Sequence, residues 1–224
     1  MSRTHPDAVI FDFDGTIFDS ETPIYQAYAA ALAELGHELT IPGWATVVGH
    51  AEDESHAALC AAVGADLDRD DLEERYARQD RSWRDTLPAL PGVEALLDEL
   101  LAAGVPLGIA SSSPESWVET HLVRLGLRDH FAVIASRDQV EGRGKPDPAS
   151  YRYATRMLAA DPARTIAVED SNPGVRAALA AGLVVVSVPS EITRHTDLSA
   201  AHHSVPSMEQ LDLATLTQLL PTHP

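Results

Sequence analysis

The chain has 224 residues, enough for one substantial hydrophobic core and a smaller second one, but short for two full-sized domains. It carries 34 acidic against 16 basic residues, and this net charge of −18 excludes duplex nucleic acid as an expected partner because both would be negative. A single cysteine excludes an intramolecular disulfide and a cysteine-based metal cluster. We expect a soluble protein of a reducing compartment, the cytoplasm, with no membrane-spanning segment and no leader peptide.

The first element that the sequence predicts is a buried strand over Ala8–Asp12, an apolar run that ends in a carboxylate. The stretch that follows contains helical patterns and no convincing strand. Helices are expected over Glu21–Leu35, Asp53–Val63 and Asp70–Arg84. We interpret this stretch as a helical insertion after the first strand. Residues 1–18 and 88–224 therefore form the predicted core domain, and residues 19–87 form a small all-helical domain.

After the insertion, strands and helices alternate to the C-terminal end. Short apolar runs predict strands over Val105–Ala110, Ala132–Ala135, Thr165–Val168 and Val184–Val188. Helical spacing, with prolines at the starts and glycines at the ends, predicts helices over Gly92–Ala103, Pro114–Leu125, Pro148–Ala160 and Pro173–Ala181. The strands lack polar alternation, which is typical of strands buried on both faces of a parallel sheet. The predicted fold class is therefore α/β, a doubly wound parallel sheet.

Two aspartates stand where the first strand ends, in the sequence Asp12-Phe13-Asp14-Gly15-Thr16. Open α/β sheets bind ligands at the carboxyl ends of their strands. Gly15 allows the backbone to turn, so that one carboxylate points into a site while the other reaches around it. The alternative is an acidic turn in which the aspartates only accept hydrogen bonds from the backbone.

A second pair of acids, Glu169 and Asp170, directly follows the strand predicted over Thr165–Val168. With Asp12 and Asp14 this pair brings four carboxylates to one edge of the sheet. Such a cluster is unstable without a cation, and oxygen ligands of this kind suit Mg²⁺. The alternative is that these polar residues only cap the helix that follows.

Neutral donors and a lysine complete the set of candidate residues. Ser111, Ser112 and Ser113 precede a helix, and a hydroxyl beside a helix N-terminus can bind phosphate. Ser113 is expected to cap that helix, which leaves Ser111 to contact a ligand. Lys145 is the only lysine in a chain with 15 arginines. Its compact charge can neutralise a phosphate or a carboxylate, although an ordinary loop lysine is the alternative.

Taken in chain order, these four groups of residues resemble the motifs of the haloacid dehalogenase superfamily. The chain is similar to the subgroup with a helical cap after the first motif, which includes β-phosphoglucomutase-like and sugar-phosphatase proteins. The resemblance covers nearly the whole chain. It implies a Mg²⁺-dependent phosphomonoester hydrolase acting on a small phosphorylated metabolite, such as a sugar phosphate, phosphoglycolate or a nucleotide. We expect a monomer or a dimer.

The resemblance also implies roles for single residues. Asp12 would be the nucleophile that forms an aspartyl phosphate, and Asp14 would protonate the leaving group and then deprotonate water. Ser111, Lys145 and backbone N–H groups near Asp14 and Ser112 would hold the phosphoryl oxygens.

The same resemblance implies the ligands of Mg²⁺. These would be the carboxylate of Asp12, the main-chain carbonyl of Asp14 and the carboxylate of Asp170. Glu169 would mostly orient metal-bound water. Mg²⁺ and Lys145 together would offset the charge of an anionic nucleophile that approaches an anionic substrate.

Two departures favour hydrolysis over intramolecular phosphoryl transfer. The β-phosphoglucomutases carry a histidine early in the first cap helix, where this sequence has Ile24. They also carry an arginine after a cap glycine, where this sequence reads Gly49-His50-Ala51-Glu52. A mutase stays an alternative. So does a receiver protein, which accepts phosphate without being an enzyme, although receivers have no such insertion and need no acid placed like Asp14.

Two features of the insertion are weaker candidates. His50 is a possible substrate-specificity residue, because cap loops of this family usually face the active site. Four arginines recur at three-residue spacing, namely Arg75, Arg78, Arg81 and Arg84. A solvated face paired with neighbouring acids is the favoured interpretation of them, and a contact to a second anionic group of the substrate is the alternative.

Overall fold

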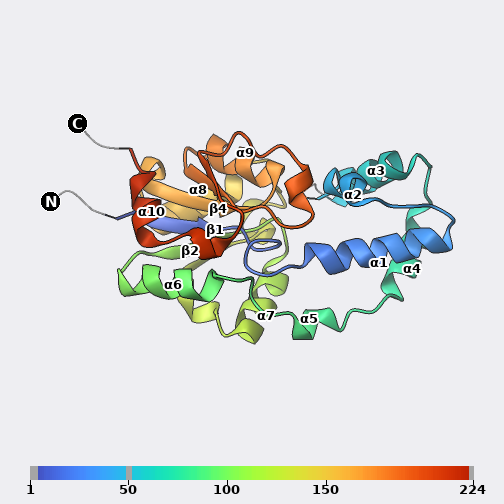
Figure 1. Ribbon diagram of the computed structural model, residues 1–224, viewed down its shortest axis with the longest axis horizontal. Coiled ribbons are helices and arrows are strands. Elements are labelled where there is room, and N and C mark those ends of the chain that lie inside the picture. Colours follow the sequence, from blue (N-terminus) through green and yellow to red (C-terminus); the bar gives the residue numbers. More distant parts are fainter. Residues whose placement is uncertain (1–4, 49–51, 222–224) are drawn as a thin grey trace.

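Buried apolar runs of the sequence become the strands of one sheet in the computed structural model, which describes residues 5–48 and 52–221 (Figure 1). The six strands are β1 Ala8–Phe11, β2 Leu107–Ala110, β3 Val133–Ala135, β4 Thr165–Glu169, β5 Val184–Ser187 and β6 His203–Ser204. All neighbouring strands pair in parallel, in the order β3-β2-β1-β4-β5-β6. The predicted α/β fold class with a parallel sheet is confirmed.

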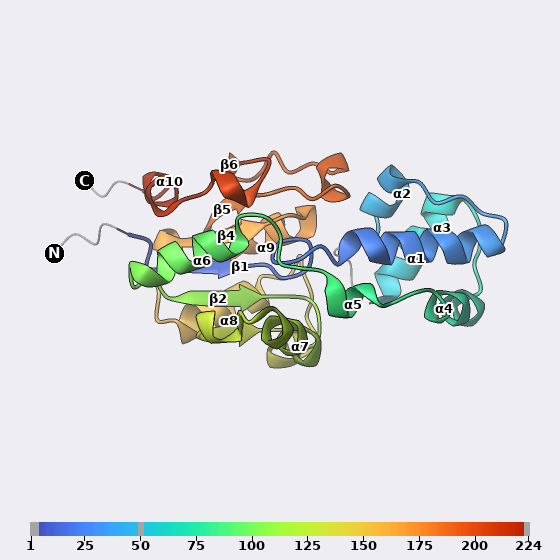
Figure 2. The ribbon, with the colours of Figure 1, turned by 60° about the horizontal axis from the view of Figure 1, so that its bottom comes forward.

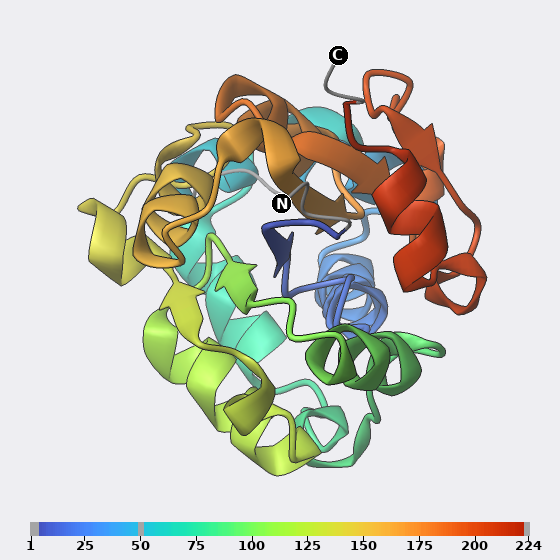
Figure 3. The same ribbon diagram turned by 90° about the vertical axis from the view of Figure 1, so that its left-hand side faces the viewer.

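Helices cover both faces of this sheet (Figure 3). They are α6 Val93–Ala102, α7 Glu115–Leu125, α8 Ala149–Met157, α9 Asn172–Ala180 and α10 Leu213–Gln218. On β1, Val9 and Phe11 pack into the core formed with α6, α7 and α10, whereas Ile10 packs into the core formed with α8 and α9. Because successive side chains of a strand point to opposite faces, both faces of β1 are buried and its end is held firmly.

A helical region lies between β1 and α6 and sits beyond the carboxyl ends of the strands (Figure 2). Its helices are α1 Glu21–Glu34, α2 Ile41–Ala45, α3 Glu52–Val63, α4 Arg69–Ala77 and α5 Trp83–Thr86. The region has its own apolar core, which includes Leu32, Trp44 and Leu72. The boundaries at residues 18/19 and 87/88 stay predictions. Among the described residues, no helix is both long and apolar enough to cross a membrane.

The structure differs from the sequence prediction in local detail. The single helix expected over Asp70–Arg84 is broken into α4 and α5. Between them the carboxylate of Asp80 accepts hydrogen bonds from the N–H and hydroxyl of Ser82, at 2.8 and 3.0 Å, so local side-chain bonding replaces the helical pattern. The helices α2 and α10 and the two-residue strand β6 were not predicted because their apolar patterns are too short to show a period.

Candidate active site

Asp12 is placed by the end of β1. Its N–H donates to the carbonyl of Val168 on β4, at 2.9 Å, which extends the sheet pairing by one residue. The side chain is 6% exposed, and its Oδ1 contacts the ammonium group of Lys145. Burial raises the pKa of Asp12 to about 7 against the opposing effect of Lys145. The carboxylate is thus rigidly held and poorly solvated.

Glu169 ends β4 and lies behind the lysine. Its Oε1 accepts hydrogen bonds from Lys145 Nζ at 2.5 Å and from the hydroxyl of Tyr151 at 2.6 Å. Its Oε2 accepts from the N–H and hydroxyl of Ser171, at 3.3 and 3.1 Å. A Cβ atom at Gly174 would overlap this carboxylate, so the first turn of α9 can approach only with glycine there. Burial alone would lower the pKa of the Lys145 ammonium group. The negative charges of Asp12 and Glu169 have the larger combined effect and raise this pKa.

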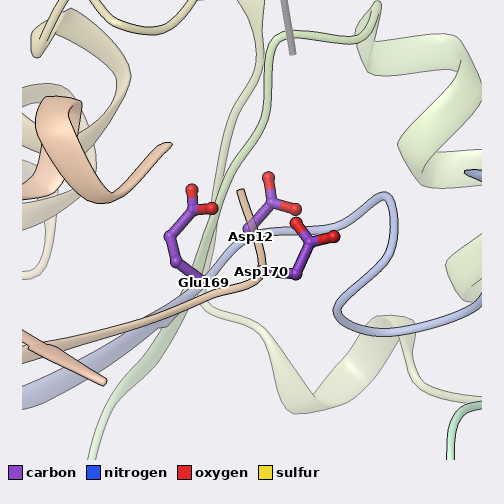
Figure 4. A group of neighbouring side chains, drawn as sticks. All are labelled: Asp12, Glu169 and Asp170. Atoms are coloured by element: carbon purple, nitrogen blue, oxygen red, sulfur yellow. The ribbon is translucent and has the colours of Figure 1, made fainter. Parts of the chain in front are cut away.

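Three buried carboxylates form a group that could hold a metal ion. Asp12, Glu169 and Asp170 each offer an oxygen, and these oxygens lie within 4.8 Å of one another (Figure 4). Burial, with the charges of Asp12 and Glu169, raises the pKa of Asp170 well above its usual value. Such crowding of anionic oxygens around one lysine fits a hard divalent cation. At Gly15, with φ +82°, a side chain would overlap the Asp170 carboxylate, so the loop after β1 requires glycine.

The carboxylate of Asp14 turns to a different set of partners. Oδ1 accepts hydrogen bonds from the hydroxyl of Ser20 at 2.7 Å and from the indole N–H of Trp117 at 2.9 Å, and Oδ2 accepts from the hydroxyl of Ser113 at 2.6 Å. The expectation that Ser113 caps the following helix is wrong, because α7 has Pro114 at its N-cap without a side-chain bond. The hydroxyl is used instead by a tertiary partner. A main-chain metal contact from Asp14 stays a prediction.

The serines that follow β2 lie across from Asp12 and Asp14. Ser111 is 2% exposed, and its hydroxyl oxygen accepts from the N–H of Ser113 at 3.0 Å. The hydroxyl of Ser112 accepts from the N–H of Lys145 at 3.0 Å, which joins the two loops. A cavity of about 220 Å³ opens between these groups; its lining includes Asp12, Asp14, Glu21, Ile24, Ser111, Ser112, Ser113, Trp117, Lys145 and Asp170. The predicted residues are therefore brought together, with Glu169 behind them.

Glu21, the first residue of α1, faces this cavity and was not among the predicted site residues. Burial, with the charges of Asp14 and Asp12, raises the pKa of Glu21 to about 8. Glu21, Ile24 and Val48 also line a second cavity of about 250 Å³ inside the helical region. Glu21 could have been predicted from its position, because it is an acidic residue at the start of the helix that follows the Asp12–Asp14 loop.

Of the weaker candidates in the helical region, the four arginines are described, and none of them lines the cavity beside Asp12. His50 lies outside the described residues. Arg75 and Arg78 pair with Glu34 at 3.1 and 3.5 Å, in agreement with a solvated, ion-paired face. The guanidinium groups of Arg81 and Arg84 instead lie over aromatic rings, those of Tyr76, Trp83 and Trp117.

Residues 9–188 match the family model described as haloacid dehalogenase-like hydrolase, so the chain belongs to this family and is a phosphatase of it. Protein YhcW of Bacillus subtilis is 37% identical over 93% of this chain and 95% of its own length. The phosphorylated carbohydrates phosphatase of Thermotoga maritima is 31% identical over 79% of this chain and 82% of its own.

A solved structure shows the same likeness in three dimensions. A CbbY variant from Rhodobacter sphaeroides, in complex with xylulose-(1,5)bisphosphate, superposes with a TM-score of 0.74 and 28% identity. The likeness covers 94% of this chain and 99% of the other. The membership in an enzyme family of hydrolases does not support the receiver alternative.

Proposed function

We propose that the protein hydrolyses a small phosphate monoester and that Asp12 is its nucleophile. The observation that carries this proposal is the buried carboxylate of Asp12 at the floor of a cavity, in contact with the one lysine of the chain. In the proposed first step, an Asp12 oxygen forms a bond to phosphorus as the bond from phosphorus to the leaving oxygen breaks. Asp14 gives its proton to that oxygen, so a neutral alcohol leaves.

In the proposed second step, Asp14 takes a proton from water, and the water oxygen attacks the phosphoryl group on Asp12. Inorganic phosphate leaves, and both carboxylates return to their starting state. Lys145 and the hydroxyl of Ser111 bind phosphoryl oxygens during both steps, with the backbone N–H of Ser112 as a further donor. Lys145 also holds Asp12 in place.

We further propose that Asp12 and Asp170 hold Mg²⁺, with the main-chain carbonyl of Asp14 as an additional ligand and Glu169 as a neighbouring carboxylate that adds negative charge to the site. The carboxylate donor set and its buried, crowded charge support this metal. When bound, Mg²⁺ supplies positive charge that lowers the repulsion between the nucleophile and the phosphoryl group. Glu169 accepts hydrogen bonds from Lys145 and Tyr151 and so orients both side chains.

A phosphorylated sugar is the substrate class that we favour, with phosphoglycolate as the next candidate and a nucleotide after it. The Thermotoga relative is named for phosphorylated carbohydrates, a CbbY structure contains xylulose-(1,5)bisphosphate, and a Neisseria meningitidis relative is a phosphoglycolate phosphatase. The cavity of about 250 Å³ in the helical region shares Glu21 and Ile24 with the site and gives room for a hydroxylated leaving group. Ile24, in place of the mutase histidine, supports hydrolysis.

The test is a panel of sugar phosphates, phosphoglycolate and nucleoside monophosphates, with released phosphate measured in Mg²⁺ and in EDTA. We expect release that EDTA abolishes and that one ester class dominates. Absence of release from every ester, with a stable phosphoryl group on the protein, would contradict hydrolysis and support the mutase. Release that EDTA leaves unchanged would contradict the proposed metal.

A further inference from the structure

Both oxygens of the Asp14 carboxylate are already occupied by donors, and one of these donors differs in kind from the others. Ser20 and Trp117 contact Oδ1, and Ser113 contacts Oδ2. A hydroxyl can turn and accept a hydrogen bond, whereas an indole N–H can only donate. A proton on Oδ1 would make this oxygen a weaker acceptor for Trp117. The N–H of Trp117 therefore keeps the proton off Oδ1.

We infer that Trp117 is a positioning residue that makes Oδ2 the oxygen through which Asp14 transfers its proton. The inference rests on the proposed role of Asp14 as the acid and base of hydrolysis. The protonated Oδ2 donates to the hydroxyl of Ser113 until a leaving group takes its place. Without the indole N–H, both oxygens of Asp14 contact only hydroxyls, so Asp14 loses the preference for carrying the proton on Oδ2, and proton transfer to the leaving oxygen becomes slower.

The ring of Trp117 is itself held from both connections between the core and the helical region. Phe18, on the outgoing connection, lies with its ring centroid 6.3 Å away. Trp83, on the returning connection, packs edge to face at 6.2 Å, and the guanidinium carbon of Arg84 lies 5.2 Å from the ring. On the core side, the ring of His121 packs at 4.2 Å. These contacts require an aromatic ring at position 117, whereas the bond to Asp14 requires the indole N–H.

The choice of variants separates the indole N–H from the packing of its ring. Trp117→Phe removes the N–H and keeps an aromatic ring. Trp83→Phe is the matched control, because it makes the same change in the same cluster at a residue with no bond to Asp14. Each enzyme is assayed with Mg²⁺ on p-nitrophenyl phosphate, whose leaving group needs little proton assistance, and on phenyl phosphate, a substrate of similar shape with a more basic leaving group.

We expect Trp117→Phe to lower kcat/KM on phenyl phosphate about 10- to 100-fold, the order expected for a lost hydrogen bond to a charged group. This parameter covers the steps up to formation of the aspartyl phosphate and leaves out the hydrolysis step that both esters share. Its kcat/KM on p-nitrophenyl phosphate should change less than about threefold, and Trp83→Phe should change neither value. Equal losses on both esters, or the same pattern in Trp83→Phe, would overturn the inference. If Asp14→Asn itself shows no preference between the esters, the proposed acid role fails instead.

A second measurement does not depend on turnover. The chain has 3 tryptophans, so ¹⁵N-labelled protein gives three indole signals, and the one missing from Trp117→Phe identifies Trp117. We expect Asp14→Asn to move this signal and to leave the signal of Trp83 in place. An unchanged Trp117 signal in a folded Asp14→Asn protein would overturn the inference, whatever the kinetics show.

Discussion

Lys145 and Glu169 form a buried ion pair, with 2.5 Å between Nζ and Oε1. The same ammonium group contacts Asp12, so one cation lies between two carboxylates at the floor of the site. The Glu169 carboxylate also accepts hydrogen bonds from the hydroxyls of Tyr151 and Ser171. Because these bonds replace hydration of the buried carboxylate, Glu169 can hold the lysine ammonium group in a fixed position. This arrangement explains why a compact ammonium is kept in a chain whose other basic residues are all arginine.

Lys145→Arg tests that explanation. The planar guanidinium is wider than the ammonium, and the lysine is 5% exposed with its Nζ 5.2 Å from the ring centre of Tyr151. We expect kcat/KM for the preferred phosphate ester to fall at least about 100-fold although the charge is retained. Arg143→Lys, an exposed exchange in the same loop, is the control and should keep the activity. Wild-type rates in Lys145→Arg would contradict the proposed role.

Asp12→Asn tests the nucleophile. The substitution keeps the shape of the side chain and removes one negative charge from a crowded site, so the fold should remain. We expect kcat to fall by about 10⁴-fold or more, as for other nucleophiles. Asp19→Asn is the matched control: it removes a charge from the same loop, where the Asp19 carboxylate accepts from the N–H of Thr22 at 3.0 Å. Turnover near that of wild type in Asp12→Asn would rule out the assignment.

The sequence was sufficient to predict the site residues that directly follow a predicted strand. Asp12, Ser111 and Asp170 each follow a buried parallel strand, and parallel strands end at one edge of the sheet. Their meeting in one cavity was therefore predictable. Gly15 could also be expected, because the turn after the strand needs a residue that tolerates positive φ.

Contacts made by the sides of helices were not predictable. The bond from Trp117 to Asp14 joins residues 103 positions apart and depends on how α7 rotates against the sheet. Tyr151 reaches Glu169 from α8 in the same way, and its ring is otherwise ordinary core. For Ser113 the local sequence predicted the wrong partner. A serine before Pro114 is typical of a helix cap, but its hydroxyl donates to Asp14 instead.

Asp14→Asn should reveal the leaving-group acid. An amide cannot supply a proton, so esters with basic alkoxide leaving groups should lose most. We expect kcat/KM to fall about 10²- to 10⁴-fold for the preferred sugar phosphate and far less for an activated aryl phosphate. The two substrates are compared in parallel, with Asp19→Asn as the reference for loss of a charge. Equal losses on both would show that Asp14 does not act as the acid.

Asp170→Asn should weaken metal binding and raise the free energy of unfolding of the metal-free protein. The buried Asp170 carboxylate accepts from the hydroxyl of Thr193 at 3.2 Å, while neighbouring Asp12 and Glu169 repel its charge. Because its pKa is raised in the folded state, the folded protein holds this proton to higher pH than the unfolded chain. Its contribution to stability is therefore present below the ordinary value of 3.8 and is lost as pH rises towards the raised pKa.

Urea unfolding at pH 5 and pH 8, in EDTA and in Mg²⁺, measures both effects. In EDTA at pH 8 we expect Asp170→Asn to unfold with a free energy roughly 1–3 kcal/mol above that of wild type, because an uncompensated buried charge is gone. The difference should shrink at pH 5. Mg²⁺ should stabilise wild type by mass action and leave the variant nearly unchanged. A variant less stable than wild type in EDTA at pH 8 would contradict the uncompensated charge at Asp170. Equal stabilisation of both proteins by Mg²⁺ would contradict the assignment of Asp170 as a metal ligand.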